Sequence, residues 1–208
     1  MRILQCSAVF PRVRLRRFFE AAPRALEYQR DTFAMPDEGP AWGDVELAAH
    51  YMSGSGEDIT LHEIGLLQQV IDYARTHDQA EAGGGTLFER VEKQIFKEAR
   101  QNGEGVFTTA FDRGTYNFGG VVWAFGHVPV HGEMDVHVVE KNGFLIVTAE
   151  IYYHFEDYFR VEAFNGEPEG ERTIDPEDRS VSVIGTKAFY IRDTWSTRLE
   201  ATIRKDSY

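Results

Sequence analysis

The amino-acid sequence predicts an α+β fold, with N-terminal helices packed on a C-terminal antiparallel β-sheet or half-barrel. Capping signals followed by apolar residues at helical spacing occur in the part of the chain before Gly105. From Gly105 onward, aromatic and β-branched residues separated by glycine are typical of strands. The pair Asn142-Gly143, between two β-rich runs, is a strong signal for a hairpin.

Length and composition predict one compact unit. The 208 residues suit a helical region, 1–104, docked on a β region, 105–208, and we expect the two to share one core. The chain has 22 Lys and Arg against 34 Asp and Glu, a net charge of -12. This acidity disfavours binding to nucleic acid or to anionic membranes, and it suits a basic protein partner.

Cysteine content and hydropathy set the expected compartment. The single cysteine, Cys6, excludes an intramolecular disulfide and a multi-cysteine zinc site. The first residues lack the pattern of a secretory signal, and no run approaches the roughly 18 apolar residues of a transmembrane helix. We expect synthesis in the cytoplasm without a signal peptide, with signal-independent export to a target-cell periplasm left open.

Helices are predicted in the first half of the chain. Capping boxes at Thr60-Glu63 and Thr86-Glu89 open two of them, and Asn102-Gly103 ends the last. Pro and Gly indicate a loop over Met35 to Gly43. The predicted helices are Val13 to Gln29, Thr60 to about Thr76, and Thr86 to Asn102.

Strands are predicted in the second half. Asp193-Thr194-Trp195 is interpreted as a turn, and Asn165 to Asp178 as an acidic loop. The predicted strands are Gly105 to Phe111, Asn117 to His127, Glu133 to Glu140, Phe144 to Phe159, Ser180 to Ile191 and Ser196 to Arg204.

The Asn142-Gly143 turn fixes the register of the hairpin, because a type I′ turn needs positive φ at both central residues. Pairing Lys141 with Phe144 separates an apolar face from an ionisable face. The apolar pairs are Val138 with Val147, Val136 with Ala149, and Met134 with Ile151. The ionisable face pairs His137 with Thr148, Asp135 with Glu150, Glu133 with Tyr152, and His131 with His154.

Asp135 and Glu150 are the first candidate site, since two carboxylates directly opposite each other repel in a plain sheet. A divalent cation, Mg²⁺ or Ca²⁺, held by both with His137 or His131, would relieve the repulsion. A shared proton would also relieve it and would create an acid/base pair. The third interpretation is a solvated face, where water screens the charges.

The histidines favour a site near this hairpin. His127, His131, His137 and His154 fall within 28 residues, although their spacing matches no compact metal signature. A histidine on a strand face is more often a surface or hydrogen-bonded side chain, so both interpretations stay open.

The end of the hairpin supplies the remaining candidates. Alternation places Asp157 on the apolar face with Tyr153 and Phe155, where burial would raise its pKa as a catalytic acid requires. The alternative is that the strand ends there and Asp157 meets solvent. The candidate catalytic residues are Asp135, Glu150, His154, Glu156, Asp157 and Tyr158.

The segments GTYNFGG from Gly114 and VHGEMDVHVVEKNGFLIVTAEIYYHFEDYF from Val130 carry a family resemblance. With the closing strands, roughly the last 95 residues resemble the β part of colicin M-like bacterial toxins and related uncharacterised bacterial domains. The resemblance implies divalent-cation-dependent cleavage of a lipid-linked peptidoglycan precursor at its pyrophosphate. The segment Glu156-Asp157-Tyr158-Phe159 approximates the family's Asp-x-Tyr-Asp motif, with Glu156 and Tyr158 on pattern. Phe159 stands where the second Asp should be, and the following His-Arg is absent.

Two functions are left as hypotheses. The first is an interbacterial toxin or effector, a metal-dependent phosphoesterase acting on a lipid-linked cell-wall precursor. The second is a non-enzymatic binding protein: an immunity protein, an adaptor or a secretion-system accessory protein. Neither includes a nucleic-acid partner or a transmembrane segment, and the second expects a cognate protein partner.

Overall fold

The computed structural model describes residues 28–79, 84–159 and 187–205. The predicted mixed α+β class with an antiparallel sheet is confirmed. In chain order the described elements are β1 (Tyr28–Phe33), α1 (Asp44–Ser53), β2 (Ile59–Thr60), α2 (Leu67–Thr76), α3 (Leu87–Asn102), β3 (Gly105–Tyr116), β4 (Val128–Lys141), β5 (Phe144–Phe159) and β6 (Phe189–Arg204).

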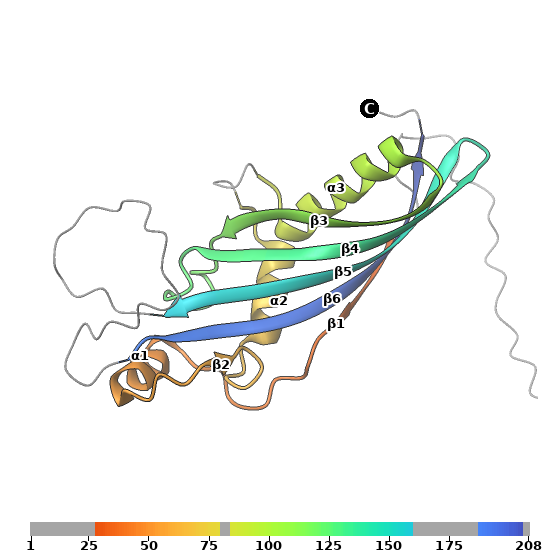
Figure 1. Ribbon diagram of the computed structural model, residues 1–208. Coiled ribbons are helices and arrows are strands. Elements are labelled where there is room, and N and C mark those ends of the chain that lie inside the picture. The colour runs from red at the N-terminus through yellow and green to blue at the C-terminus, as the bar shows by residue number, and fades with distance from the viewer. Residues whose placement is uncertain (1–27, 80–83, 160–186, 206–208) are drawn as a thin grey trace, which may run out of the picture.

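The strands form one curved sheet with the order β1-β6-β5-β4-β3 among the described residues (Figure 1). Each neighbouring pair along this path is antiparallel, and β3 to β6 follow one another as a meander. The short β2 pairs with β6 in parallel, through Ile59 and Thr60. Both β1 and β2 come from the region predicted to be helical, so that prediction is wrong for these residues.

The predicted hairpin register is confirmed at every position. Lys141 pairs with Phe144, and Asp135 pairs with Glu150. Asn142 has a φ of 55° and Gly143 a φ of 77°, the positive values that the predicted turn requires. The apolar face of β4 and β5 is buried, and its residues include Met134, Val136, Val138, Val147, Ala149 and Ile151.

The last helix also agrees with its sequence signals. Thr86 Oγ1 accepts a hydrogen bond from the Glu89 N–H at 3.2 Å, and the Glu89 carboxylate accepts one from the Thr86 N–H at 3.1 Å. These reciprocal bonds satisfy two N–H groups that a helix start otherwise leaves without partners. The helix ends at Asn102, and Gly103 follows with a φ of 71°.

The predicted start of the preceding helix at Thr60 is wrong, because α2 begins at Leu67. The Thr60-Glu63 signal is used in a turn, where the Thr60 N–H and hydroxyl both donate to the Glu63 carboxylate. Gly65 follows with a φ of 69°, which a helix does not accommodate. Asp37 then caps α2 by accepting from the Leu67 N–H at 3.1 Å.

Two predictions in the β region are also corrected. Residues 117–127 form turns instead of a strand, closed by a hydrogen bond from the Phe118 N–H to the Phe125 carbonyl. Their aromatic residues cover the end of the sheet, since Phe118 and Phe125 both lie edge-on to Phe155. Asp193 to Trp195 lie inside β6 rather than in a turn. The predicted helix at 13–27, the loop at 165–178 and the strand at 180–186 lie outside the described residues.

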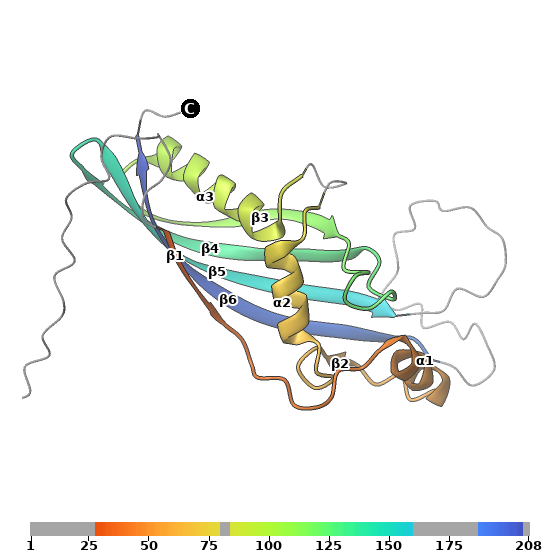
Figure 2. The same cartoon turned by 180° about the vertical axis from the view of Figure 1, so that it is seen from behind.

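One hydrophobic cluster joins the helices to the sheet. Helices α2 and α3 lie over one face, called the inner face, and the opposite, outer face carries no helix of the described chain (Figures 1 and 2). Phe88 of α3 stacks on Tyr153 of β5 with ring centroids 5.2 Å apart, and Tyr153 stacks on Trp195 of β6 at 5.1 Å. The core therefore lies between the helices and the inner face.

Candidate functional site

The carboxylates Asp135 and Glu150 face each other on the outer face, and both are exposed. The Thr108 hydroxyl donates to Asp135 at 2.7 Å, and the Tyr152 hydroxyl donates to Glu150 at 3.0 Å. Arg198 of β6 lies opposite Glu150 on its other side. Hydrogen bonds, a neighbouring cation and water thus all act against the repulsion between the two carboxylates.

The pKa of the Tyr152 phenol responds to the negative charges of this face. Its hydrogen bond to Glu150, followed by the charges of Glu150 and Asp135, raises the pKa of Tyr152 above its usual value. A phenol that donates to a carboxylate is held in its protonated form. The face is therefore electronegative at neutral pH.

The four residues proposed to hold a cation do not form one cluster. His137 pairs with Thr148, whereas His131 stacks on His154 with ring centroids 5.2 Å apart. His131 lies four residues before Asp135 on β4, about 13 Å at the rise of a strand. Within residues 28–79, 84–159 and 187–205, no group of three or more His, Cys, Asp or Glu side chains could hold a metal ion.

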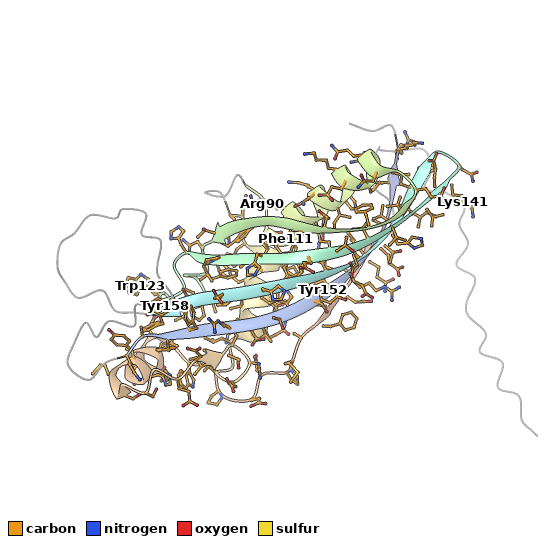
Figure 3. All side chains as sticks on the ribbon, viewed as in Figure 1. Arg90, Phe111, Trp123, Lys141, Tyr152 and Tyr158 are labelled. Carbon is orange, nitrogen blue, oxygen red and sulfur yellow. The ribbon has the colours of Figure 1, made fainter. Side chains whose placement is uncertain are left out.

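The side chains of residues 156–158, which carry part of the family resemblance, alternate between the two faces of the sheet. Glu156 accepts from Arg192 at 2.8 Å, and Tyr158 contacts the Tyr190 ring with centroids 4.8 Å apart. Figure 3 labels Tyr152 and Tyr158 along β5, on the side of the sheet away from α2. Asp157 lies between them in sequence and has the inward orientation of Phe155. Glu156 and Asp157 therefore cannot act on one substrate group from the same side of the sheet.

Asp157 has the perturbed acidity expected from its position. Burial raises its pKa to about 6, against a smaller opposing effect of a hydrogen bond from the Tyr158 backbone. Its cross-strand partner, Ile191, is fully buried. A carboxyl group with a pKa in this range can exchange a proton near neutral pH.

A second carboxylate on the inner face, Asp193, was not identified from the sequence as a site residue. Its Oδ2 lies 3.0 Å from His62 Nδ1 and accepts from the His62 N–H at 2.9 Å. Its Oδ1 accepts from the Thr194 N–H at 2.7 Å. The Asp193 side chain is 6% exposed and that of His62 is 19% exposed, so the imidazole is oriented by a buried carboxylate.

Asp157 and Asp193 are diagonal neighbours on the inner face. Asp157 pairs with Ile191, two residues before Asp193 on β6. Such diagonal positions lie about 7–8 Å apart in an antiparallel sheet. No local sequence signal indicates the His62–Asp193 contact, because 131 residues separate the two positions.

A third polar group is buried beneath α3. Glu92 contacts Arg30, and burial raises the pKa of Glu92 to about 8. Burial also raises the pKa of the Tyr153 phenol. The hydrogen bond with Thr197 and the charge of Arg30 act in the opposite direction, with smaller effects. Glu92 was not identified as a candidate, since its position on a helix of mixed sequence carries no motif.

No family model matches this chain, and no curated protein or solved structure is significantly similar to it. Among the described helices, none combines the length and the apolar character needed to span a bilayer.

Proposed function

We propose that the protein is a non-enzymatic binding protein, of the immunity, adaptor or secretion-accessory kind, that binds a basic protein partner with the outer face of its sheet. The observation that carries the proposal is this broad face, on which carboxylates and tyrosines gather opposite the side covered by α2 and α3. The proposal takes the sheet and these helices as a half-barrel whose outer side is available to a partner.

Charge and aromatic content support a protein partner. The carboxylates of this face outnumber its arginines, which are Arg192, Arg198 and Arg204, and the whole chain carries a net charge of -12. Complementary charge steers two proteins together, and tyrosine is enriched where protein surfaces bind. The carboxylates are Asp31, Glu133, Asp135, Glu150, Glu156 and Glu200, and the tyrosines are Tyr152, Tyr158 and Tyr190.

The arrangement of the carboxylates fits binding better than catalysis. Asp135 accepts from a threonine and Glu150 from a tyrosine, so both are held in fixed positions on an open surface. Catalytic carboxylates instead act in water-excluded sites, where electrostatic interactions are stronger. An exposed, ordered acidic surface is what a basic partner can recognise.

The test begins with capture of a partner from the cell of origin at low salt, followed by purification of both proteins. The dissociation constant is then measured for the wild type and for Glu133→Gln/Asp135→Asn/Glu150→Gln. We expect the triple variant to bind at least about tenfold more weakly, with a shallower dependence on salt.

The matched control is a variant that neutralises three exposed carboxylates outside the outer face, Glu38→Gln/Glu57→Gln/Glu104→Gln. Equal loss in both variants, or capture of no partner at low salt, would contradict the proposal.

We propose a toxin-like phosphoesterase as the second candidate, because of Asp157. Its raised pKa and its position beside the Asp193–His62 pair suit a general acid. Production in the periplasm of a bacterial host should then arrest growth, and Asp157→Asn should relieve the arrest. Relief by the exposed control Glu104→Gln to the same degree would rule out a specific role for Asp157.

The divalent cation of this second candidate is tested separately. Asp135 and Glu150 would hold it on the outer face. Asp157 lies on the inner face, so this cation and the general acid would not act on the same phosphoryl group. Mg²⁺ or Ca²⁺ at a hundredfold excess over its dissociation constant should then stabilise the protein by about 2.7 kcal/mol, seen as a higher unfolding midpoint. The proposed site requires that Asp135→Asn/Glu150→Gln abolish this shift.

A further inference from the structure

His131 of β4 and His154 of β5 lie directly opposite each other on the outer face of the sheet. Residues in such positions of an antiparallel pair have their Cβ atoms about 4.5–5.5 Å apart. The two ring centroids are 5.2 Å apart, and the ring planes are inclined by only 19°. The pairing of the strands therefore brings two imidazoles together above one point of the sheet.

The separation of the rings suits joint coordination of one metal ion. A zinc–nitrogen bond is about 2.0–2.1 Å long, and two imidazoles on a tetrahedral ion then have ring centres about 5 Å apart. The observed centroids are 5.2 Å apart, so coordination requires rotation of the rings and no movement of the strands. Nδ1 of His131 is buried, which leaves its Nε2 as the nitrogen that a metal can reach.

The strands hold the two imidazoles in place. The β4–β5 pairing continues on both sides of them, with Val130 opposite Phe155 and Gly132 opposite Tyr153. All four of these neighbours are buried, and the two histidines are themselves half-buried. Ligands that are ordered in advance bind more tightly, because less conformational entropy is lost on binding.

The charges around the pair favour a cation. On the same face, Glu133 is exposed two residues after His131, and Glu156 follows two residues after His154. Arg192 pairs with Glu156 at 2.8 Å and compensates that carboxylate. Glu133 and the net charge of -12 still favour a positive ion over a negative one at this place.

The ligand type decides which metals suit the site. Imidazole nitrogen suits Zn²⁺, Cu²⁺ and Ni²⁺, whereas Mg²⁺ and Ca²⁺ prefer oxygen ligands. Two imidazoles fill two coordination positions, and water can occupy the others, as it does in open metal sites. The pair is thus distinct from the carboxylates Asp135 and Glu150, which lie about 13 Å away along the strands.

We propose that His131 and His154 form a two-histidine site for a divalent transition-metal ion of the Zn²⁺, Cu²⁺ and Ni²⁺ class. Both imidazoles bind in the neutral form, so the metal takes the place of protons that would set two positive charges opposite each other. The site goes beyond the proposed function, because metal binding here needs no partner protein.

The first experiment titrates the wild-type protein with Zn²⁺ and follows binding by calorimetry and by long-range ¹H–¹⁵N NMR spectra of the imidazoles. We expect one equivalent of Zn²⁺ to shift the signals of two of the seven histidines together, and excess Mg²⁺ should not reverse the shift. Absence of binding up to about 1 mM Zn²⁺, or a shift of a single histidine, would overturn the proposal without any variant.

Variants then locate the site. His131→Asn and His154→Asn should each weaken Zn²⁺ binding at least about tenfold, because loss of even an outer-shell partner of a metal has an effect of this size. His127→Asn is the matched control, since His127 is exposed and precedes β4, and it should leave affinity within about twofold. Circular dichroism checks that each variant is folded. Unchanged affinity in either folded site variant, or an equal loss in the control, would overturn the assignment.

Asp135→Asn/Glu150→Gln separates the two-histidine site from the carboxylate pair. Its Zn²⁺ affinity should stay within about threefold of the wild type, because salt screens exposed charges at a distance of about 13 Å. A loss of about tenfold or more would place the ion at the carboxylates and contradict the two-histidine site.

Discussion

At the scale of single residues, Asp157 shows how the alternation of side chains along a strand affects the pKa of a carboxyl group. It follows Tyr153 and Phe155 at the period of two, so its carboxyl group enters the apolar side of the sheet. There the charged form loses hydration, and its pKa rises to about 6. Alternation in the sequence assigns this side and this direction of the shift, but it leaves open that the strand ends and Asp157 meets solvent. The structure decides between the two, because β5 continues to Phe159.

Asp157→Asn should therefore stabilise the protein above pH 6. The native state binds the proton more tightly than the unfolded chain, whose Asp pKa is near 4, so stability is highest below pH 4 and falls as pH rises through about 6. A shift of about two pKa units corresponds to about 3 kcal/mol. Urea unfolding should show a gain of about 2–3 kcal/mol at pH 7.5 and little change at pH 4.

The exposed control Glu104→Gln isolates the effect of burial. It should leave the free energy of unfolding within about 0.5 kcal/mol of the wild type at both pH values. An equal gain for Asp157→Asn at pH 4 and pH 7.5 would mean that burial of the charge is not the cause.

Asp193 differs from Asp157, because its carboxylate accepts hydrogen bonds from backbone N–H groups. It accepts from the N–H groups of His62 and Thr194 and ties the turn before α2 to β6. Asp193→Ala leaves these donors without that acceptor and should cost about 2 kcal/mol in urea unfolding at pH 7. Asp135→Ala, which removes an exposed carboxylate, should cost less than about 1 kcal/mol. Equal costs would contradict the anchoring role.

At the scale of elements, local signals succeed where all their partners are near in sequence. The hairpin joins strands through two residues, so Asn142-Gly143 determines its register. The Thr60-Glu63 signal is equally clear, yet its hydrogen bonds form in a turn. There β6 pairs with Ile59 and Thr60, and this distant partner decides the local conformation.

Gly132 marks where two elements approach each other closely. A Cβ at this position would overlap the Tyr152 carbonyl of β5 and the Phe111 ring of β3, beside the register shift that follows Phe111. Gly132→Ala should destabilise the protein by about 2–4 kcal/mol, because neither backbone nor buried ring can yield easily. The measurement is the midpoint and slope of urea unfolding.

Gly126→Ala is the matched control, since its Cβ would meet no atom within 4 Å. Its unfolding free energy should stay within about 0.5 kcal/mol of the wild type. A loss of comparable size in this variant would assign the effect of Gly132→Ala to chain flexibility rather than to overlap.

At the scale of the whole molecule, the helices and the sheet depend on one another. Phe88 of α3 stacks on Tyr153 of β5, and the buried residues of both regions form one cluster. Neither region can bury its apolar face without the other. The predicted division at residue 104 therefore marks a change of secondary structure within a continuous core.

Thermal unfolding should accordingly be one cooperative transition, with coincident far-ultraviolet circular dichroism and tryptophan fluorescence. Phe88→Ala should lower both transitions together and cost about 3–5 kcal/mol, because it removes a buried ring. The exposed control Val106→Ala should cost less than about 1 kcal/mol. Separate transitions for the two probes would contradict a shared core.

The sequence by itself determines the α+β class, helix α3 and the β4–β5 hairpin. Each of these depends on periodicity, capping or turn chemistry within a short stretch of chain. The tertiary structure decides the His62–Asp193 contact and the buried Arg30–Glu92 pair. Their partners are separated by dozens of residues, so only the folding of the chain onto one sheet brings them together, and no local pattern encodes that proximity.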